Sequence, residues 1–172
     1  MIIGSVTLTL EALNLTTLYD PANGEIIYTE WVNEWYFNYD PTSDLSDLDF
    51  VYNSTSTGPE ADINTGINSF KADGDGWYDI IFYFPEKNSH RFTDDEKVIY
   101  EITAPGLTAG SFDYLSAQLT NGSNSGPFPT ASHIGGIDDD DSGWVTAKVP
   151  EPSVLLLLGL SIIGLAVIKR RS

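Results

Sequence analysis

The sequence predicts an all-β fold: an antiparallel β-sandwich of jelly-roll type with about eight strands, plus one hydrophobic C-terminal helix. Short segments rich in β-branched and aromatic residues alternate with Asn-Gly, Asp-Gly and Pro-Gly turn signals. One of these segments alternates between aromatic and polar residues. The chain has 172 residues, 41% hydrophobic and 12% aromatic, which suffices for a packed core without a single cysteine.

In chain order, the predicted strands are residues 2–11, 26–38, 48–53, 77–84, 96–103, 111–119, 130–134 and 143–147. The alternation is clearest in residues 29–39, where Trp31, Trp35 and Phe37 occupy odd positions and mostly polar residues occupy the even ones. A half-buried antiparallel strand shows this pattern, so the odd positions are expected to face the core. The segment 77–84 is apolar on both faces, which predicts a central strand.

The net charge is −17, and it is concentrated in the body of the chain. Residues 1–149 contain 24 acidic side chains against five basic ones, a net charge of −19. Such a surface repels phosphate backbones, so we expect no nucleic-acid partner. The absence of cysteine excludes disulfides, thiolate metal sites and thiol nucleophiles.

The last 25 residues differ in character from the body. Pro150, Glu151 and Pro152 precede an uncharged apolar run, Val154–Ile168, and the chain then closes on a basic tail of Lys169, Arg170 and Arg171. Fifteen helical residues extend about 22 Å, less than the roughly 30 Å hydrocarbon core, but flanking residues and snorkelling side chains lengthen the span. We therefore predict an acidic β-sandwich domain at 1–147 and a C-terminal unit at 148–172, with a transmembrane helix at 153–168 and a basic tail at 169–171.

The alternative for the apolar run, a buried core helix, is disfavoured because the run has no polar face. The basic residues that follow it predict a cytoplasmic C-terminus by the positive-inside rule. The acidic body is then expected outside the cytoplasm.

The Pro-Glu-Pro tripeptide, the apolar run and the basic end together resemble the PEP-CTERM sorting signal. The resemblance implies a Gram-negative bacterium that makes exopolysaccharide, and recognition by an exosortase that cleaves near the tripeptide. It also implies passage through the inner membrane, held by the C-terminal helix, and then delivery to the cell surface or extracellular matrix. Proteins with this signal normally begin with a secretory signal peptide, whereas residues 2–11 have the pattern of a strand. Either the true start lies upstream of Met1, which we favour, or export proceeds without a cleavable signal.

Asp73, Asp75 and Asp79 alternate with glycine and aromatic residues and form a candidate Ca²⁺ site, since Ca²⁺ takes six to eight oxygen ligands from acidic loops. The competing interpretation, which we favour, is a solvated Asp-Gly turn ahead of a buried strand. Calcium is the only cofactor that the sequence suggests.

Trp31 and Trp35 are candidate carbohydrate-binding residues, because aromatic faces stack on sugars. Their shared face with Phe37 favours burial in the core instead. The sequence offers no recognisable catalytic motif, so we predict a non-enzymatic structural or interaction protein of the surface or matrix, associated with exopolysaccharide. The alternative is a surface carbohydrate-binding module, Ca²⁺-dependent if the acidic turn binds the ion. A secreted hydrolase is a third and weaker interpretation.

Overall fold

The computed structural model describes residues 2–87, 90–118, 126–137 and 141–147. Its strands are β1 Ile3–Glu11, β2 Thr17–Tyr19, β3 Ile26–Thr29, β4 Trp31–Phe37, β5 Asp49–Tyr52, β6 Asp62–Ala72, β7 Gly76–Tyr83, β8 Lys97–Pro105, β9 Thr130–Ile137 and β10 Asp141–Thr146. Two short 3₁₀ helices, η1 Leu45–Asp47 and η2 Ala109–Phe112, interrupt the strands.

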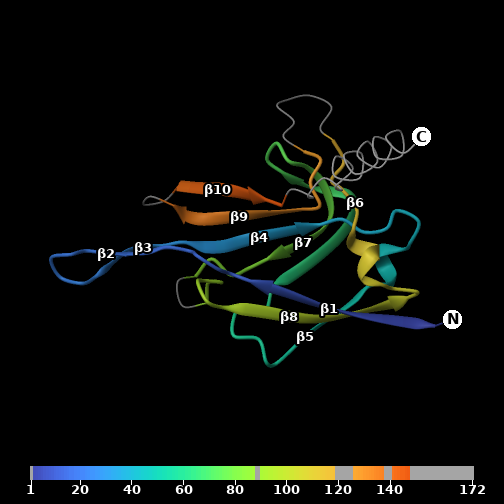
Figure 1. The fold of residues 1–172 in the computed structure, drawn as a ribbon, viewed down its shortest axis with the longest axis horizontal. Helices are drawn as coiled ribbons and strands as arrows, with labels where there is room; N and C mark the ends of the chain where they lie inside the picture. The colour runs from blue at the N-terminus through green and yellow to red at the C-terminus, as the bar shows by residue number, and fades with distance from the viewer. Residues whose placement is uncertain (1, 88–89, 119–125, 138–140, 148–172) are drawn as a thin grey trace, which may run out of the picture.

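The strands form two facing antiparallel sheets and a small ribbon (Figure 1). One sheet has the order β1-β8-β5 and the other β10-β9-β4-β7-β6, while β2 and β3 pair in a ribbon that projects at the left of the view. The all-β antiparallel prediction is confirmed. The three-plus-five division differs from the two equal sheets expected of an eight-stranded jelly roll.

The main core lies between the two sheets. In β8 the even positions Val98, Tyr100 and Ile102 are almost fully buried, because alternate side chains of a strand point to the same face. They meet Phe82 and Ile80 of β7 from the opposite sheet, and the Phe82 and Tyr100 rings pack edge to face at 5.3 Å. Such contacts add about 0.5–1.5 kcal/mol each beyond the area that they bury.

A second, smaller cluster covers the other face of the five-stranded sheet. It contains buried Tyr36, Tyr78 and Ile81, with Trp144 of β10 packed against them. Both faces of β7 are therefore apolar because both are covered, which confirms the predicted central strand.

Two predicted strands need correction. The segment 26–38 is divided into β3 and β4, and the register of β4 against β9 shifts between Val32 and Glu34. The extra residue reverses the alternation, so Val32 faces the core and Trp31, one residue earlier, faces the opposite side. The segment 111–119 is not a strand over its described part: η2 is followed by a loop that makes one isolated bridge, from Ala117 to Trp77.

Two strands were not predicted, β2 and the 11-residue β6. The predicted C-terminal helix at 153–168 lies outside the described residues. Within the described ranges, no helix has the length and apolar character needed to cross a bilayer.

Candidate functional site

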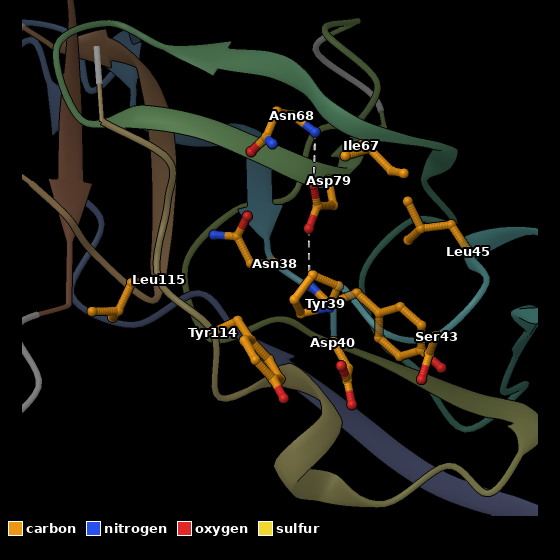
Figure 2. A pocket seen from close by; sticks show the side chains of 11 residues that line it. Asn38, Tyr39, Asp40, Ser43, Leu45, Ile67, Asn68, Asp79, Tyr114 and Leu115 are labelled. Carbon is orange, nitrogen blue, oxygen red and sulfur yellow. Dashed lines mark hydrogen bonds between the residues drawn. The ribbon is translucent and has the colours of Figure 1, made fainter. Parts of the chain in front are cut away.

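A polar cleft lies where β4 leaves the five-stranded sheet (Figure 2). It encloses about 140 Å³, below the roughly 300–1,000 Å³ of usual small-molecule pockets, so it is a shallow subsite. Residues from five segments line it: Asn38, Tyr39, Asp40, Pro41 and Ser43 after β4, Leu45 of η1, Ile67 and Asn68 of β6, Asp79 of β7, and Tyr114 and Leu115 after η2.

The cleft exists because the pairing of β6 with β7 is interrupted. Thr65 pairs with Ile80 and Phe70 with Tyr78, so four residues of β6 face the single residue Asp79. A wide irregularity of this kind leaves backbone groups without ladder partners. It also opens the sheet at the point where the cleft forms.

Asp79 replaces the missing ladder contacts. Its Oδ1 accepts a hydrogen bond from the Asn68 backbone N–H at 2.7 Å, and its Oδ2 accepts one from the Tyr39 backbone N–H at 3.2 Å (Figure 2). Asn68 adopts a left-handed backbone with φ of 45°, a conformation that asparagine tolerates better than most residues. The carboxylate thus joins the bulge of β6 to the segment that leaves β4.

Asn38 is the least satisfied polar residue at the cleft. Its side chain is only 2% exposed, and its Nδ2 has no hydrogen-bond partner. A buried amide donor without an acceptor costs about 1–3 kcal/mol. Because this nitrogen is itself buried from solvent, a ligand in the cleft cannot reach it without a movement of the wall.

Asp40 is the second carboxylate that lines the cleft, beside Asp79. Hydrogen bonds from the Thr42 hydroxyl and backbone N–H, and a further one from Tyr114, hold its pKa below the usual value. Burial raises the pKa of Tyr39, so that phenol stays neutral. The cleft therefore combines two carboxylates held by hydrogen bonds, Asp40 and Asp79, with hydroxyl and amide groups. It suits recognition of polar hydroxyls better than general acid catalysis, because a glycosidase needs one carboxyl of raised pKa.

The candidate calcium ligands do not converge. Asp73 is exposed in the β6–β7 turn, Asp75 is buried at 8% exposure, and Asp79 is occupied by the two backbone amides. Across the described part of the chain, no three acidic or histidine side chains lie close enough to hold a metal ion. Burial, and then the charge of Asp73, raise the pKa of Asp75, which disfavours a charged ligand there.

Neither tryptophan of the carbohydrate hypothesis forms an open platform. Trp35 packs against the main core, and its Nε1 donates to the Thr130 hydroxyl at 2.8 Å. The Arg91 guanidinium covers Trp31, 3.4 Å from its ring centroid. Trp35 therefore belongs to the main core, as the core interpretation predicted. Trp31 is partly buried on the opposite face of β4, outside both apolar clusters, so the predicted shared face is wrong.

A second group of polar side chains lies on the outer face of the five-stranded sheet. His133 of β9 stacks on Trp144 with ring centroids 4.7 Å apart, and its Nδ1 lies 3.7 Å from Glu34 Oε2. The Tyr36 hydroxyl donates to the same Glu34 oxygen at 2.6 Å. The carboxylate is thus shared between two packing partners, Tyr36 and His133.

Sequence reasoning missed the residues of the polar cleft, including Asn38, Asp40 and Tyr114. They come from segments far apart in the sequence and share no spacing. The only local signal was the Asn-Tyr-Asp-Pro run after the strongly alternating segment, which is typical of a turn.

Comparison with protein families bears on the other end of the chain. A family model described as the PEP-CTERM protein-sorting motif matches residues 148–171. The chain carries a PEP-CTERM sorting motif. The match covers Pro150, Glu151 and Pro152 and the basic residues Lys169, Arg170 and Arg171, all outside the described residues.

This PEP-CTERM motif implies recognition by an exosortase and sorting of the exported chain toward the cell envelope or surface. No curated protein and no solved structure matches the chain. The motif therefore indicates where the protein goes, while the activity of the β-sandwich depends on its own geometry.

Proposed function

We propose that this protein is a non-enzymatic structural or interaction component of the bacterial surface or extracellular matrix, associated with exopolysaccharide. Its PEP-CTERM unit at 148–172 acts as a delivery signal, held in the inner membrane of a Gram-negative cell until an exosortase removes it. The acidic β-sandwich is the part that remains. The observation that carries this proposal is the sorting motif attached to an acidic all-β body.

Two properties of the body support a role in the matrix. A net charge of −19 over residues 1–149 keeps the domain soluble among polymers and attracts small cations. The polar cleft holds Asp40 in the ionised form and engages Asp79 with backbone amides. The lowered pKa of Asp40 makes it a poor proton donor, and Asp79 already accepts two backbone hydrogen bonds, which supports a binding role over catalysis.

The test is mass spectrometry of the native protein from its host, after separation of inner membrane, cell surface and matrix. We expect the surface and matrix forms to end near Pro150. For comparison, a variant with Pro150 and Pro152 changed to alanine keeps the apolar run and the basic tail, so it differs from the native chain only in the Pro-Glu-Pro tripeptide. It should stay uncut in the inner-membrane fraction. An intact C-terminus at Ser172 in the matrix fraction would contradict the proposal.

Association with exopolysaccharide has a separate test. In a host strain that lacks exopolysaccharide, the mature protein should be released into the medium instead of sedimenting with the cells. Equal retention in both strains would remove exopolysaccharide from the proposal and leave the sorting route intact.

A second candidate function is binding of a carbohydrate at the polar cleft. The ionised Asp40 carboxylate beside the Tyr114 ring favours it, because a carboxylate accepts hydrogen bonds from sugar hydroxyls and an aromatic face stacks on a sugar ring. The small volume suits one sugar unit of a longer chain that passes across the surface. Calcium could assist such a module only with ligands beyond Asp73 and Asp75, since Asp79 is already engaged.

Tyr114 and Tyr83 make a matched pair for testing this second function. Their side chains are 37% and 38% exposed, but only Tyr114 lines the cleft. Calorimetric titration with exopolysaccharide purified from the host should show at least a fivefold loss of affinity for Tyr114→Ala and no change for Tyr83→Ala. Equal effects of the two substitutions would exclude the cleft as the binding site.

A further inference from the structure

Strand β1 forms one edge of the three-stranded sheet, and the structure shows which of its backbone groups are free. At one end of the β1–β8 ladder, the Gly106 N–H donates to the Ile2 carbonyl, and at the other end the Ala12 N–H donates to the Glu96 carbonyl. Both bonds involve even-numbered residues of this segment. In an antiparallel ladder the intervening residues direct their N–H and C=O groups away from the partner strand.

Ser5, Thr7 and Thr9 therefore point their backbone groups toward the open edge. Among the described residues no strand pairs with this edge, since β1 ends the order β1-β8-β5. β1 has nine residues, contains neither proline nor lysine, and pairs with β8 without a register shift. The devices by which proteins usually protect an edge strand are thus missing, apart from the single charge of Glu11.

Two mainly apolar clefts, together called the trough below, open beside this edge between the two sheets. A cleft of about 270 Å³ opens at the middle of β1, lined by Val6, Leu8 and Phe37 among other mainly apolar residues. A second cleft of about 400 Å³ opens at the end of β1, where Val32 and Ile134 of the opposite sheet form part of the wall.

The trough follows from the unequal sizes of the sheets. Three strands cannot cover five, so the inner faces of β9 and β10 extend past β1. Val145 of β10 is 59% exposed at this place, and Val6 and Leu8 are only half-buried although they face inward. One further strand beside β1 would cover all three side chains.

The free backbone and the trough together specify the shape of an occupant. An extended segment beside β1 would bond to the outward groups of Ser5, Thr7 and Thr9, and every second side chain would enter the trough. From Thr7 in the first cleft to Ala12 in the second is about 17 Å along a strand, so roughly seven residues reach both clefts.

Charge indicates the chemistry of the occupant. Glu11 and Glu30 line the second cleft, and no basic residue lines either one. A second copy of this chain would bring another net charge of −17 to the same surface, which opposes association. A basic side chain at one end of the incoming segment would meet Glu11 and Glu30.

We propose that β1 and the adjoining trough form a strand-acceptor site. The occupant is an extended segment of another exported protein, with apolar residues at alternate positions and a basic residue at the end that lies near Glu11. Its binding completes the smaller sheet with a fourth strand.

The probe is an eleven-residue peptide of alternating valine and threonine between two lysines, added to the full-length chain. Amide hydrogen exchange measured by NMR should show protection rising at least tenfold at Ser5, Thr7 and Thr9. Val6 and Leu8, already bonded to β8, should change far less. This alternation distinguishes strand addition from a general gain in stability, and its absence at saturating peptide overturns the proposal.

Thr7→Pro removes one outward N–H and no bond to β8, so it should weaken peptide binding at least tenfold while melting within a few degrees of the parent chain. Thr7→Ser keeps the N–H and is the matched control, expected to bind as the parent does. If Thr7→Pro fails to fold, a peptide N-methylated at alternate residues gives the same test on the unchanged protein, and equal binding of this peptide refutes the proposal. If sedimentation velocity shows dimers without peptide, and amide exchange shows the same three amides protected in them, the occupant is a second copy of this chain and the proposal is also overturned.

Discussion

Asp79 offers the most direct test of how the polar cleft is built. Its two carboxylate oxygens accept the only hydrogen bonds described for the Asn68 and Tyr39 backbone N–H groups. Asp79→Ala removes both acceptors and leaves the interruption between β6 and β7 without a bridge. We expect the substitution to destabilise the fold and to disorder the cleft wall.

The size of the effect follows from the two bonds. Loss of an acceptor costs about 1–3 kcal/mol for each donor left unpaired, and the partial exposure of the cleft lets water recover some of that. We expect a loss of about 3 kcal/mol in the free energy of unfolding, which lowers the melting temperature by roughly 10 °C in a domain of this size. Asp79→Asn keeps one acceptor and should lose about half as much.

Asp73→Ala is the matched control, because it removes the same charge from the exposed turn of the same hairpin. In a chain of net charge −17, removal of one acidic charge relieves repulsion and should slightly stabilise the fold. The assay is urea denaturation followed by tryptophan fluorescence. If Asp79→Ala is no less stable than Asp73→Ala, the carboxylate does not hold the cleft together and our account of the interruption is wrong.

Four further predictions concern the core and the turn. Tyr100→Phe leaves a backbone N–H without its acceptor and should cost about 1–2 kcal/mol in urea denaturation. Burial raises the pKa values of Tyr78 and Tyr100 to about 12. The stability that these neutral phenols contribute is therefore complete below about pH 10 and is lost as the pH rises toward 12. Phenolate absorbance and circular dichroism should change together over this range. Gly135→Ala places a Cβ 2.5 Å from the Trp31 ring and should cost about 1–3 kcal/mol, whereas Gly110→Ala meets nothing closer than 3.8 Å and should be nearly neutral in the same assay. Calcium and a chelator should give equal melting temperatures, since the described residues hold no three-ligand group; a shift of several degrees would revive the calcium site.

The strands that the sequence predicted well are those in which local pattern and burial agree. β8 alternates cleanly and is buried on its even positions, so its prediction at 96–103 differs from Lys97–Pro105 only at the ends. β7 is apolar on both faces because two clusters cover it. Composition and periodicity were sufficient for these strands, because each residue that the pattern predicts to be buried is also buried by the packing of the sheets.

Two of the failures, in β4 and β6, share one physical cause, irregular pairing. One extra residue in β4 moved Trp31 to the opposite face from Trp35, and nothing in the sequence marks that position. In β6 the apolar residues Ile63, Ile67 and Phe70 are spaced irregularly because the interruption inserts residues between paired segments. An alternation rule assumes unbroken register, so it missed the longest strand of the protein.

The same irregularities explain why the cleft residues were invisible from the sequence. Asn38 lies one residue beyond β4, and Tyr114 lies in a loop predicted to be a strand. Only the break at Asp79 and the departure of the chain after β4 bring these two side chains to one cavity. Long-range placement of this kind depends on sheet order, which the strand predictions did not include.

The two proposed binding features arise from opposite departures from an ideal sandwich. The polar cleft forms where one sheet loses pairing, and there Asp79 satisfies the released backbone groups, so the cleft is fixed in shape before any ligand arrives. The strand-acceptor edge forms where the smaller sheet lacks a neighbour, and there Ser5, Thr7 and Thr9 keep their backbone groups unpaired. The first feature can bind a ligand without changing the protein, whereas the second changes the sheet when it is occupied. Both features lie in residues 1–147, outside the sorting motif at 148–171, so each stays on the domain that remains if the exosortase removes the motif as proposed, and each can be tested separately there.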